Sequence, residues 1–386
     1  SGEVGGAGDR VPGEGRGKTP GAREKPFCHS EAMTAPFYED ARNGAAIYCG
    51  DCLDVLPNLP DSSVDLILTD PPFYKVKDEG WDNQWATPAD FLGWLDRVLV
   101  EFARVLKPNG SLYLFTSPQM GARVEILIGE RFEVLTNIRW RKEEGRHKAS
   151  CKEELRAFFP ASETIIFAEH FGADGAAKGE AGYETKCDQI RGQIFEPLRK
   201  YLDDERMAAG LDKIAINVAC GFSASPGGMA ARHYFSRSQW WLPTPEHYAA
   251  IRALAPGNFL REYKDLRDEY EALHAQYEEL RKEYEELRRP FTVSSKVPYT
   301  DVWDFETVGT HPGKHICEKP MPLLRHMISA SSRPGAVVLD AFGGSCSTAD
   351  AAKQLGRRSI TIERDEKWCR RGAARLSQEV LPLFAG

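Results

Sequence analysis

Short apolar runs alternate with amphipathic stretches in two separate parts of the chain. Each run ends in a turn signal, so the runs predict buried strands at residues 45–49, 63–68, 111–116, 133–140, 164–168, 336–340 and 359–363. Apolar residues at helical spacing predict helices at 54–59, at 91–106 and from the end of the 340–348 loop through Leu355. Strands that alternate with helices in this way indicate an α/β fold with a parallel, doubly wound sheet.

The pattern between these two parts is helical. Helices are predicted at 190–207 and 213–220, with a tight turn at Gly210 between them. Two helices joined by such a turn are typical of a helix-turn-helix, whose second helix can enter a DNA major groove. Turns of this kind are also common in any helical domain, so both interpretations stay open.

Residues 258–290 carry the most regular pattern of the chain. Tyrosine recurs every seven residues from Tyr263 to Tyr284, and leucine does so from Leu266 to Leu287. This spacing predicts a long helix with a coiled-coil seam, and the flanking charges favour a parallel pair over an antiparallel one. We therefore predict a homodimer. The alternative is that the seam packs on its own domain or on a short partner helix.

These patterns divide the chain into five segments. Residues 1–35 are rich in Gly, Pro and charge, and we expect them to form a disordered leader. The other segments are one half of the α/β domain at 36–182, a helical region at 183–257, the heptad helix at 258–290 and the other half of the α/β domain at 291–386.

Composition restricts the partners and the location. No apolar run approaches the ~20 residues that span a bilayer, and no segment near the start resembles a signal peptide, so we expect no membrane partner and a cytoplasmic or nucleoid location. The nine cysteines are scattered, which favours reduced thiols. The Cys49-Gly-Asp-Cys52 pair lacks a second pair or a His cluster, so no metal site is predicted.

The formal net charge of −7 is not the bulk signature of a nucleic-acid binder, so any DNA contact requires a local basic patch. One candidate patch follows the predicted strand 133–140, although interleaved glutamates also fit a solvated loop. The other interleaves basic and polar residues with aromatics near Trp240, which also fits a small buried core. The candidate DNA-contacting residues are Lys75, Arg141, Lys142, Arg146, Lys148, Arg232, His233, Arg237 and Gln239.

The Thr69-Asp70-Pro71-Pro72-Phe73 loop follows the predicted strand 63–68. Proline cannot continue a strand ladder, so Asp70 and Phe73 lie on a stiff loop at the carboxyl end of a strand, where open α/β sheets bind ligands. The Phe73 ring can stack on a planar heterocycle while Asp70 and the Pro71 carbonyl accept hydrogen bonds from an exocyclic amine. Taken alone, the same residues also fit an ordinary turn.

A second motif lies near the end of the chain. Residues 340–348 form a loop of mostly small residues after a predicted strand, a helix follows, and Glu363 ends the next strand. This order is typical of nucleotide-binding βαβ units, in which Glu363 is placed to accept both hydroxyls of a ribose. The loop is not G-x-G-x-x-G, which weighs against a dinucleotide.

Together these motifs resemble the S-adenosylmethionine-dependent amino-group DNA methyltransferases. The Asp-Pro-Pro-Phe half comes first, an inserted region follows and the cofactor half is last, an order similar to that of their β class. The resemblance covers about residues 45–170 and 300–376, and residues 80–85 look like those of phage or prophage members. It implies a Rossmann-like sheet in circularly permuted order with a helical target-recognition insert, S-adenosylmethionine as cofactor, and double-stranded DNA and a homodimer as partners.

The resemblance also implies roles for individual residues. It implies a catalytic role for Asp70, Pro71, Pro72 and Phe73. Cys346 stands where the family usually has glycine, which adds a Cβ beside the cofactor. The implied cofactor-binding residues are Asp51, Cys52, His315, Lys319, Pro320, Asp340, Phe342, Gly343, Gly344, Ser345, Ser347, Thr348 and Glu363.

We therefore predict an enzyme that flips an adenine out of duplex DNA and methylates its N6. The nearest alternative is N4 methylation of cytosine, for which this family more often has Ser-Pro-Pro than the Asp-Pro-Pro found here. A second alternative is a non-catalytic DNA-binding protein on a methyltransferase fold. A small-molecule or RNA methyltransferase would leave the large helical insert without a role.

Overall fold

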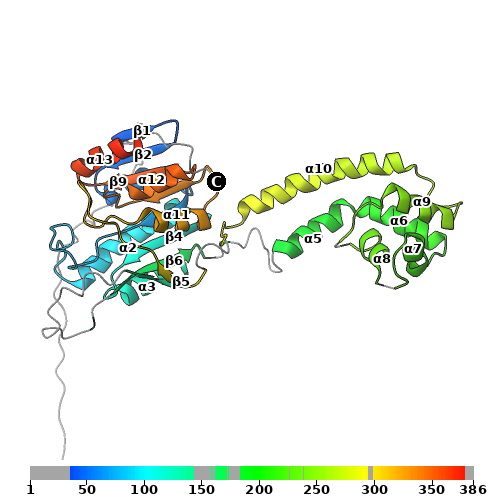
Figure 1. The fold of residues 1–386 in the computed structure, drawn as a ribbon, viewed down its shortest axis with the longest axis horizontal. Coiled ribbons are helices and arrows are strands. Elements are labelled where there is room, and N and C mark those ends of the chain that lie inside the picture. Colours follow the sequence, from blue (N-terminus) through cyan, green and yellow to red (C-terminus); the bar gives the residue numbers. More distant parts are fainter. Residues whose placement is uncertain are drawn as a thin grey trace, which may run out of the picture. The chain divides into compact units, whose positions relative to one another are not determined.

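The computed structural model describes residues 35–142, 158, 161–171, 173, 183–225, 227–237, 239–293 and 299–378. Within these residues, the α/β domain is built on a nine-stranded sheet (Figure 1). Its strands are β1 (Tyr38–Asp40), β2 (Ala45–Cys49), β3 (Val64–Thr69), β4 (Leu106–Thr116), β5 (Glu133–Arg141), β6 (Ser162–Glu169), β7 (Val302–Asp304), β8 (Val337–Asp340) and β9 (Arg358–Glu363).

The strand order is β1-β2-β9-β8-β3-β4-β6-β5-β7. Strands β2, β9, β8, β3 and β4 are parallel, so the predicted α/β fold is confirmed, whereas β1 and β6 run antiparallel to their neighbours and make the sheet mixed. Strands β8 and β9 from the end of the chain lie between β2 and β3, which follow one another in sequence. The carboxyl ends of these four strands therefore meet at one edge, with a topological switch point between β3 and β8.

Helices cover both faces of this sheet. On one face, α2 (Pro88–Val105) and α3 (Gly121–Gly129) pack on residues of β3 and β4 such as Ile67 and Leu114. On the other face, α11 (Met321–Ser331) and α12 (Ser347–Gln354) pack on alternate residues of the same strands, such as Leu68 and Phe115. The strands point successive side chains to opposite faces, so both faces of the central strands are apolar.

The element bounds differ from the predicted ones where proline or a cap decides them. Helix α2 begins earlier than predicted because Thr87 and Asp90 form a capping box before its first apolar residue. The predicted helix 54–59 is α1 (Cys52–Val55) followed by the 3₁₀ turn Leu56–Asn58, which contains Pro57. Residues 107–110, between the predicted helix 91–106 and the predicted strand 111–116, belong to β4.

The helical region has its own hydrophobic core. The predicted helix 190–207 is two helices, α5 (Tyr183–Ile194) and α6 (Glu196–Ala208), which are separated at Phe195 just before Pro197. Leu198, Ile216 and Trp240 are buried in this core. The remaining helices of the region are α7 (Lys213–Ala219), α8 (Met229–Tyr234), α9 (Pro245–Leu254) and α10 (Tyr263–Leu287).

Helix α10 is the heptad helix, and it is shorter than the predicted 258–290. Leu266 and Tyr277 from its apolar seam are buried in the core of the helical region, and the other tyrosines and leucines of the seam before Leu287 pack partly buried against the same core. The seam thus packs on its own chain, which was the alternative to a coiled coil. Homodimerisation stays a prediction. None of the described helices is long and apolar enough to span a membrane.

Cys346 lies at the start of α12 in a left-handed conformation, with a φ of 56°. Its fully buried side chain packs with Ile47 of β2 and Cys369 of α13 (Glu366–Leu376), and it is not among the residues that line the cleft at the sheet edge. A Cβ built on Gly372 would lie 2.2 Å from Cys346 Sγ. The glycine of α13 therefore makes the room that the thiol needs.

We expect Gly372→Ala to lower the free energy of unfolding by about 1–3 kcal/mol, because the new methyl group overpacks a full core. Urea-induced unfolding followed by circular dichroism measures the change. Cys346→Gly in the same variant should recover most of the loss, since glycine removes the clash and suits the left-handed backbone. Equal stability of Gly372→Ala and the parent would contradict this packing.

Candidate active site

The two halves of the α/β domain are bonded to each other where β3 and β8 end. Thr69 Oγ1 donates a hydrogen bond of 2.8 Å to Asp340 Oδ1 and accepts one of 3.1 Å from the Ala341 N–H. The Phe342 N–H also donates to Asp340 Oδ1, at 3.1 Å. Burial raises the pKa of Asp340, while these hydrogen bonds oppose that rise. The loop after β8 is thereby fixed beside the Asp70 loop after β3.

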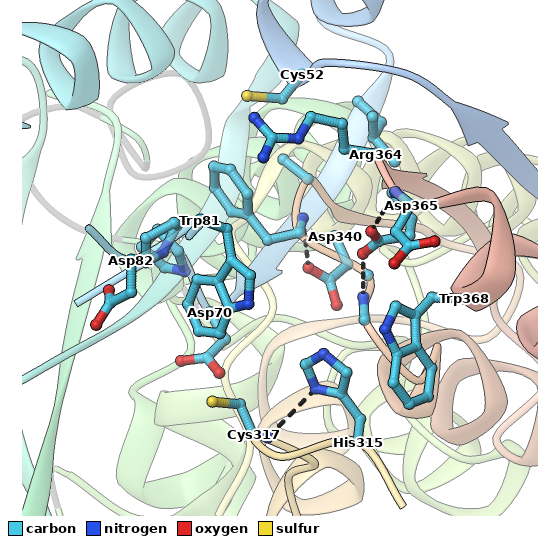
Figure 2. A pocket seen from close by; sticks show the side chains of 18 of the residues that line it. Cys52, Asp70, Trp81, Asp82, His315, Cys317, Asp340, Arg364, Asp365 and Trp368 are labelled. Carbon is cyan, nitrogen blue, oxygen red and sulfur yellow. Dashed lines mark hydrogen bonds between the residues drawn. The ribbon is translucent and has the colours of Figure 1, made fainter. Parts of the chain in front are cut away.

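A cleft of about 1010 Å³ opens at this edge of the sheet. Figure 2 shows Asp70, Asp340, His315 and Trp368 around it. Pro320 is outside the lining and precedes α11 as its N-cap. The predicted catalytic and cofactor-binding residues that line the cleft are Asp51, Cys52, Asp70, Pro71, Pro72, Phe73, His315, Lys319, Asp340, Phe342, Gly343, Gly344, Ser345, Ser347, Thr348 and Glu363.

A side chain at either of the two glycines after β8 would crowd a neighbouring residue. A Cβ on Gly343 would lie 2.2 Å from Thr361 Cγ2, and one on Gly344 would lie 3.1 Å from the His315 ring. The His315 ring meets Trp368 edge-on, with 4.5 Å between the centroids, and its Nδ1 accepts the Cys317 N–H at 3.2 Å. Burial, and then the Lys319 ammonium, lower the pKa of His315 to about 4, so the ring is neutral at pH 7.

Carboxylates lie on both sides of the loop that contains Gly343 and Gly344. Glu363 Oε2 accepts the Gly344 N–H at 2.7 Å, and Oε1 accepts the Asp365 N–H at 2.7 Å, so the carboxylate is held at the end of β9. Asp51, at the end of β2, caps α1 by accepting the Leu53 N–H at 2.9 Å. A carboxylate oxygen has more than one lone pair, so both groups can still accept hydroxyl or amino donors. These carboxylate acceptors beside the glycine loop after β8 fit the hydroxyl and amino donors of a nucleoside.

Arg375 on α13 joins the segment before α11 to the loop after β8, and it had no sequence signal. Its Nη2 donates to Glu318 Oε1 at 2.7 Å, and its Nη1 donates to the Ser345 carbonyl at 3.0 Å. Trp94 on α2 was also missed, and its ring lies 5.6 Å from that of Phe342. Both residues come from helices outside the motifs, where sequence shows only an amphipathic pattern.

Asp70 is paired with Lys319, which donates a hydrogen bond to Asp70 Oδ2. Burial is the main effect on Asp70 and raises the pKa of its carboxyl to about 6, although the Lys319 ammonium lowers it. Burial also opposes the charge of Lys319, but Asp70 and then Glu163 hold the pKa of Lys319 above its usual value. Asp70 Oδ1 is buried and accepts no hydrogen bond from any residue in the described part of the chain.

The loop after Phe73 is held by Asp82, another residue that sequence analysis did not single out. The Asp82 carboxylate is fully buried and accepts hydrogen bonds of 2.7 Å from the N–H groups of Phe73, Val76 and Lys77. Lys75, with a φ of 59°, is in the left-handed region that side chains disfavour, and its N–H donates to the Asp82 carbonyl. Asp82 therefore fixes both the loop and the backbone of Phe73.

Those predicted DNA-contacting residues that the structure describes do not line the cleft. Several have protein partners. Arg141 pairs with Asp304, Lys142 pairs with Glu163, Arg237 pairs with Glu196, His233 stacks on Trp241, and Lys75 donates to the Ala86 carbonyl. Arg232 and Gln239 are exposed, and Arg146 and Lys148 lie outside the described residues. Their contact with DNA stays a prediction.

Comparison with known proteins assigns the class. Residues 64–375 match the N6/N4 methyltransferase family, described as DNA methylase, and the chain belongs to this family. The chain is thus an S-adenosylmethionine-dependent DNA methyltransferase. The chain is 24% identical over 332 residues to the DNA adenine methyltransferase YhdJ of Escherichia coli K12. The aligned region covers 85% of this chain and 81% of that protein.

The fold is similar to that of one solved structure, and a second solved structure matches less closely. The PvuII DNA methyltransferase, named cytosine-N4-specific, is similar with a TM-score of 0.50 and 13% identity over 90% of each chain. The M1.HpyAVI complex with S-adenosylmethionine has a TM-score of 0.44 and 17% identity over 86% of this chain and 98% of that one. One relative is thus named for adenine and one neighbour for cytosine, so these names leave the target base open.

We expect Asp82→Asn to lower the free energy of unfolding by about 1–3 kcal/mol, because an amide turns a donor toward N–H groups that need an acceptor. Thermal unfolding of the purified variant measures the loss. Asp78→Asn, an exposed change in the same loop, is the matched control and should shift stability by no more than about 0.5 kcal/mol. Similar losses in both variants would contradict the role of Asp82.

Proposed function

We propose that the enzyme methylates N6 of adenine in double-stranded DNA and that Asp70 binds the target amine. The observation that carries this proposal is Asp70 Oδ1, a buried acceptor without a hydrogen-bond partner among the described residues. It lies in a cleft that also holds the glycine loop after β8. A buried acceptor of this kind requires a donor, and an exocyclic amine supplies one.

The chemistry that this arrangement supports is a direct displacement. The lone pair of an exocyclic amine is delocalised into the ring, so the nitrogen is a weak nucleophile. Hydrogen bonds from the amine to Asp70 and to the Pro71 carbonyl draw the nitrogen toward tetrahedral geometry and aim its lone pair, while the base stacks on Phe73. S-adenosylmethionine, when bound, supplies an electrophilic methyl group on a sulfonium.

The methyl transfer moves one positive charge onto the target nitrogen. With S-adenosylmethionine bound, the amine nitrogen would form a bond to the methyl carbon as the carbon–sulfur bond breaks, and the positive charge would move from sulfur to nitrogen. The nitrogen would then lose one proton to water, which gives the neutral methylated amine. The Asp70 carboxylate lies where this positive charge develops, so it stabilises the transition state more than the neutral amine.

The proposed cofactor contacts are based on the two carboxylates and on the glycine loop after β8. Glu363 would accept the ribose hydroxyls, and Asp51 would contact the adenine of the cofactor. The backbone at Gly344, where a Cβ would face the His315 ring that lines the cleft, would let the nucleoside approach closely. His315, neutral and held against Trp368, would close the methionine end without adding a second positive charge beside the sulfonium.

The target must leave the duplex to reach Asp70, so the proposal includes base flipping. The helical region is proposed to recognise the target sequence, because it carries exposed Arg232 and Gln239 next to the half-exposed Trp241. Adenine is favoured over cytosine on two grounds. Asp-Pro-Pro rather than Ser-Pro-Pro precedes Phe73, and YhdJ, which matches most of the chain, is named as an adenine methyltransferase.

Incubation with S-adenosylmethionine and mixed-sequence duplex DNA, followed by nucleoside mass spectrometry, tests the proposal. We expect N6-methyladenine from the parent and from exposed Asp78→Ala, and at least about 100-fold less from Asp70→Ala, which removes the transition-state contact. N4-methylcytosine would keep the mechanism and overturn the choice of base. No methylated base on any DNA would favour a non-catalytic binder.

The pKa of Asp70 gives the rate a pH dependence. Burial raises this pKa to about 6, so the carboxylate is the main form above pH 6 and is progressively protonated below it. We expect the single-turnover methylation rate to be level near pH 8 and to fall about tenfold per unit well below pH 6. A rate that stays constant down to about pH 5 would contradict the need for an ionised Asp70.

A further inference from the structure

Lys319 lies between two carboxylates from different strands. Its ammonium donates to Asp70 Oδ2 at the end of β3 and lies 3.6 Å from Glu163 Oε2 on β6. The side chains of Lys319, Asp70 and Glu163 are only 8%, 18% and 13% exposed. The ammonium therefore has two anionic partners: Asp70, to which it is hydrogen-bonded, and Glu163, with which it forms an ion pair without a hydrogen bond.

The hydrogen bond from Lys319 to Asp70 conflicts with the proposed methyl transfer. An ammonium hydrogen-bonded to Asp70 Oδ2 leaves only Oδ1 for the exocyclic amine. Its positive charge also opposes the positive charge that develops on the target nitrogen, and opposition of this kind is strong in a buried site. Lys319 thus favours the ionised form of Asp70 when no target is bound. During methyl transfer, however, it reduces the stabilisation that Asp70 gives to the positive charge on the target nitrogen.

Glu163 offers the ammonium a second place. Glu163 Oε1 pairs with Lys142, whereas its buried Oε2 accepts no hydrogen bond from any residue that the structure describes. Burial opposes the charge of Glu163, but Lys319 and Lys142 together hold its pKa below the usual value, so it is a carboxylate at neutral pH. A buried charged oxygen without a donor is costly unless a donor reaches it in another state of the enzyme.

We propose that Glu163 is a positioning residue that accepts Lys319 when the target amine binds to Asp70. Lys319 then hydrogen-bonds Glu163 Oε2, and both oxygens of Asp70 become available to the amine. No covalent bond changes and no proton moves in this exchange, so the cluster keeps its charge. The ammonium lies 4.8 Å from the ring centre of Phe115 and 5.4 Å from that of Phe73, and such faces stabilise a cation.

This inference rests on the proposed function of Asp70 and adds residues that act through it. Glu163 does not line the cleft, so it is not expected to touch the cofactor or the base. Other ionisable groups act on the three members of the cluster, and every variant keeps them. They are Asp340, Cys317, Lys77 and Lys142.

Glu163→Gln tests the exchange, because an amide is a neutral and weaker acceptor for an ammonium. We expect its single-turnover methylation rate to fall about tenfold or more at saturating cofactor and DNA, as for one lost charged hydrogen bond. Its affinity for S-adenosylmethionine, measured by calorimetry, should stay that of the parent. Glu101→Gln, which removes the carboxylate of another partly buried ion pair, is the control and should keep the parent rate.

A double-mutant cycle separates this role from a structural one. Once Lys319→Met has removed the ammonium, Glu163→Gln should have no further effect on the rate, because Glu163 acts through Lys319. An equal loss with and without Lys319 would overturn the proposal, as would a parent-like rate for Glu163→Gln. If Glu163→Gln does not fold, Glu163→Asp replaces it in the cycle, with the same two outcomes. A parent that methylates no DNA would instead refute the proposed function.

Discussion

The hydrogen bond from Thr69 Oγ1 to Asp340 Oδ1 is the interaction on which the rest of the site depends. It forms only if β8 lies beside β3, and it compensates part of the cost of burying Asp340. The same contact aligns the glycine loop after β8 with the Asp70 loop after β3. One cleft therefore takes residues from two parts of the chain that are far apart in sequence.

Charge is arranged around this junction with few free donors or acceptors. Lys319 favours the ionised form of Asp70, and Glu163 forms an ion pair with the same ammonium. Arg375 joins the segment before α11 to the glycine loop through hydrogen bonds to both. Each of these groups is costly to bury alone, but each has an opposite charge or a hydrogen bond nearby. Among the described residues that line the cleft, Asp70 has a buried side-chain oxygen without a hydrogen-bond partner, which is why the proposed chemistry is placed there.

Sequence predicted the central strands because apolar runs and their turn signals are local features. The Asp70 loop and Glu363 could be predicted for the same reason, since each ends such a run. Sequence could not predict Asp82 or Glu163, whose roles come from hydrogen bonds and charges contributed by other segments. The seam of α10 shows a further limit, because a heptad pattern gives an apolar stripe but not what covers it.

The most direct test of the central claim is a crystal structure with S-adenosylmethionine or an inert analogue and a duplex that carries the target base. The measurement is the distance from the exocyclic nitrogen of the flipped base to Asp70 Oδ1. We expect a hydrogen bond of about 2.7–3.2 Å, with the base on Phe73 and the cofactor ribose at Glu363. A base amine bound away from Asp70, or a cofactor away from Glu363, would contradict the account.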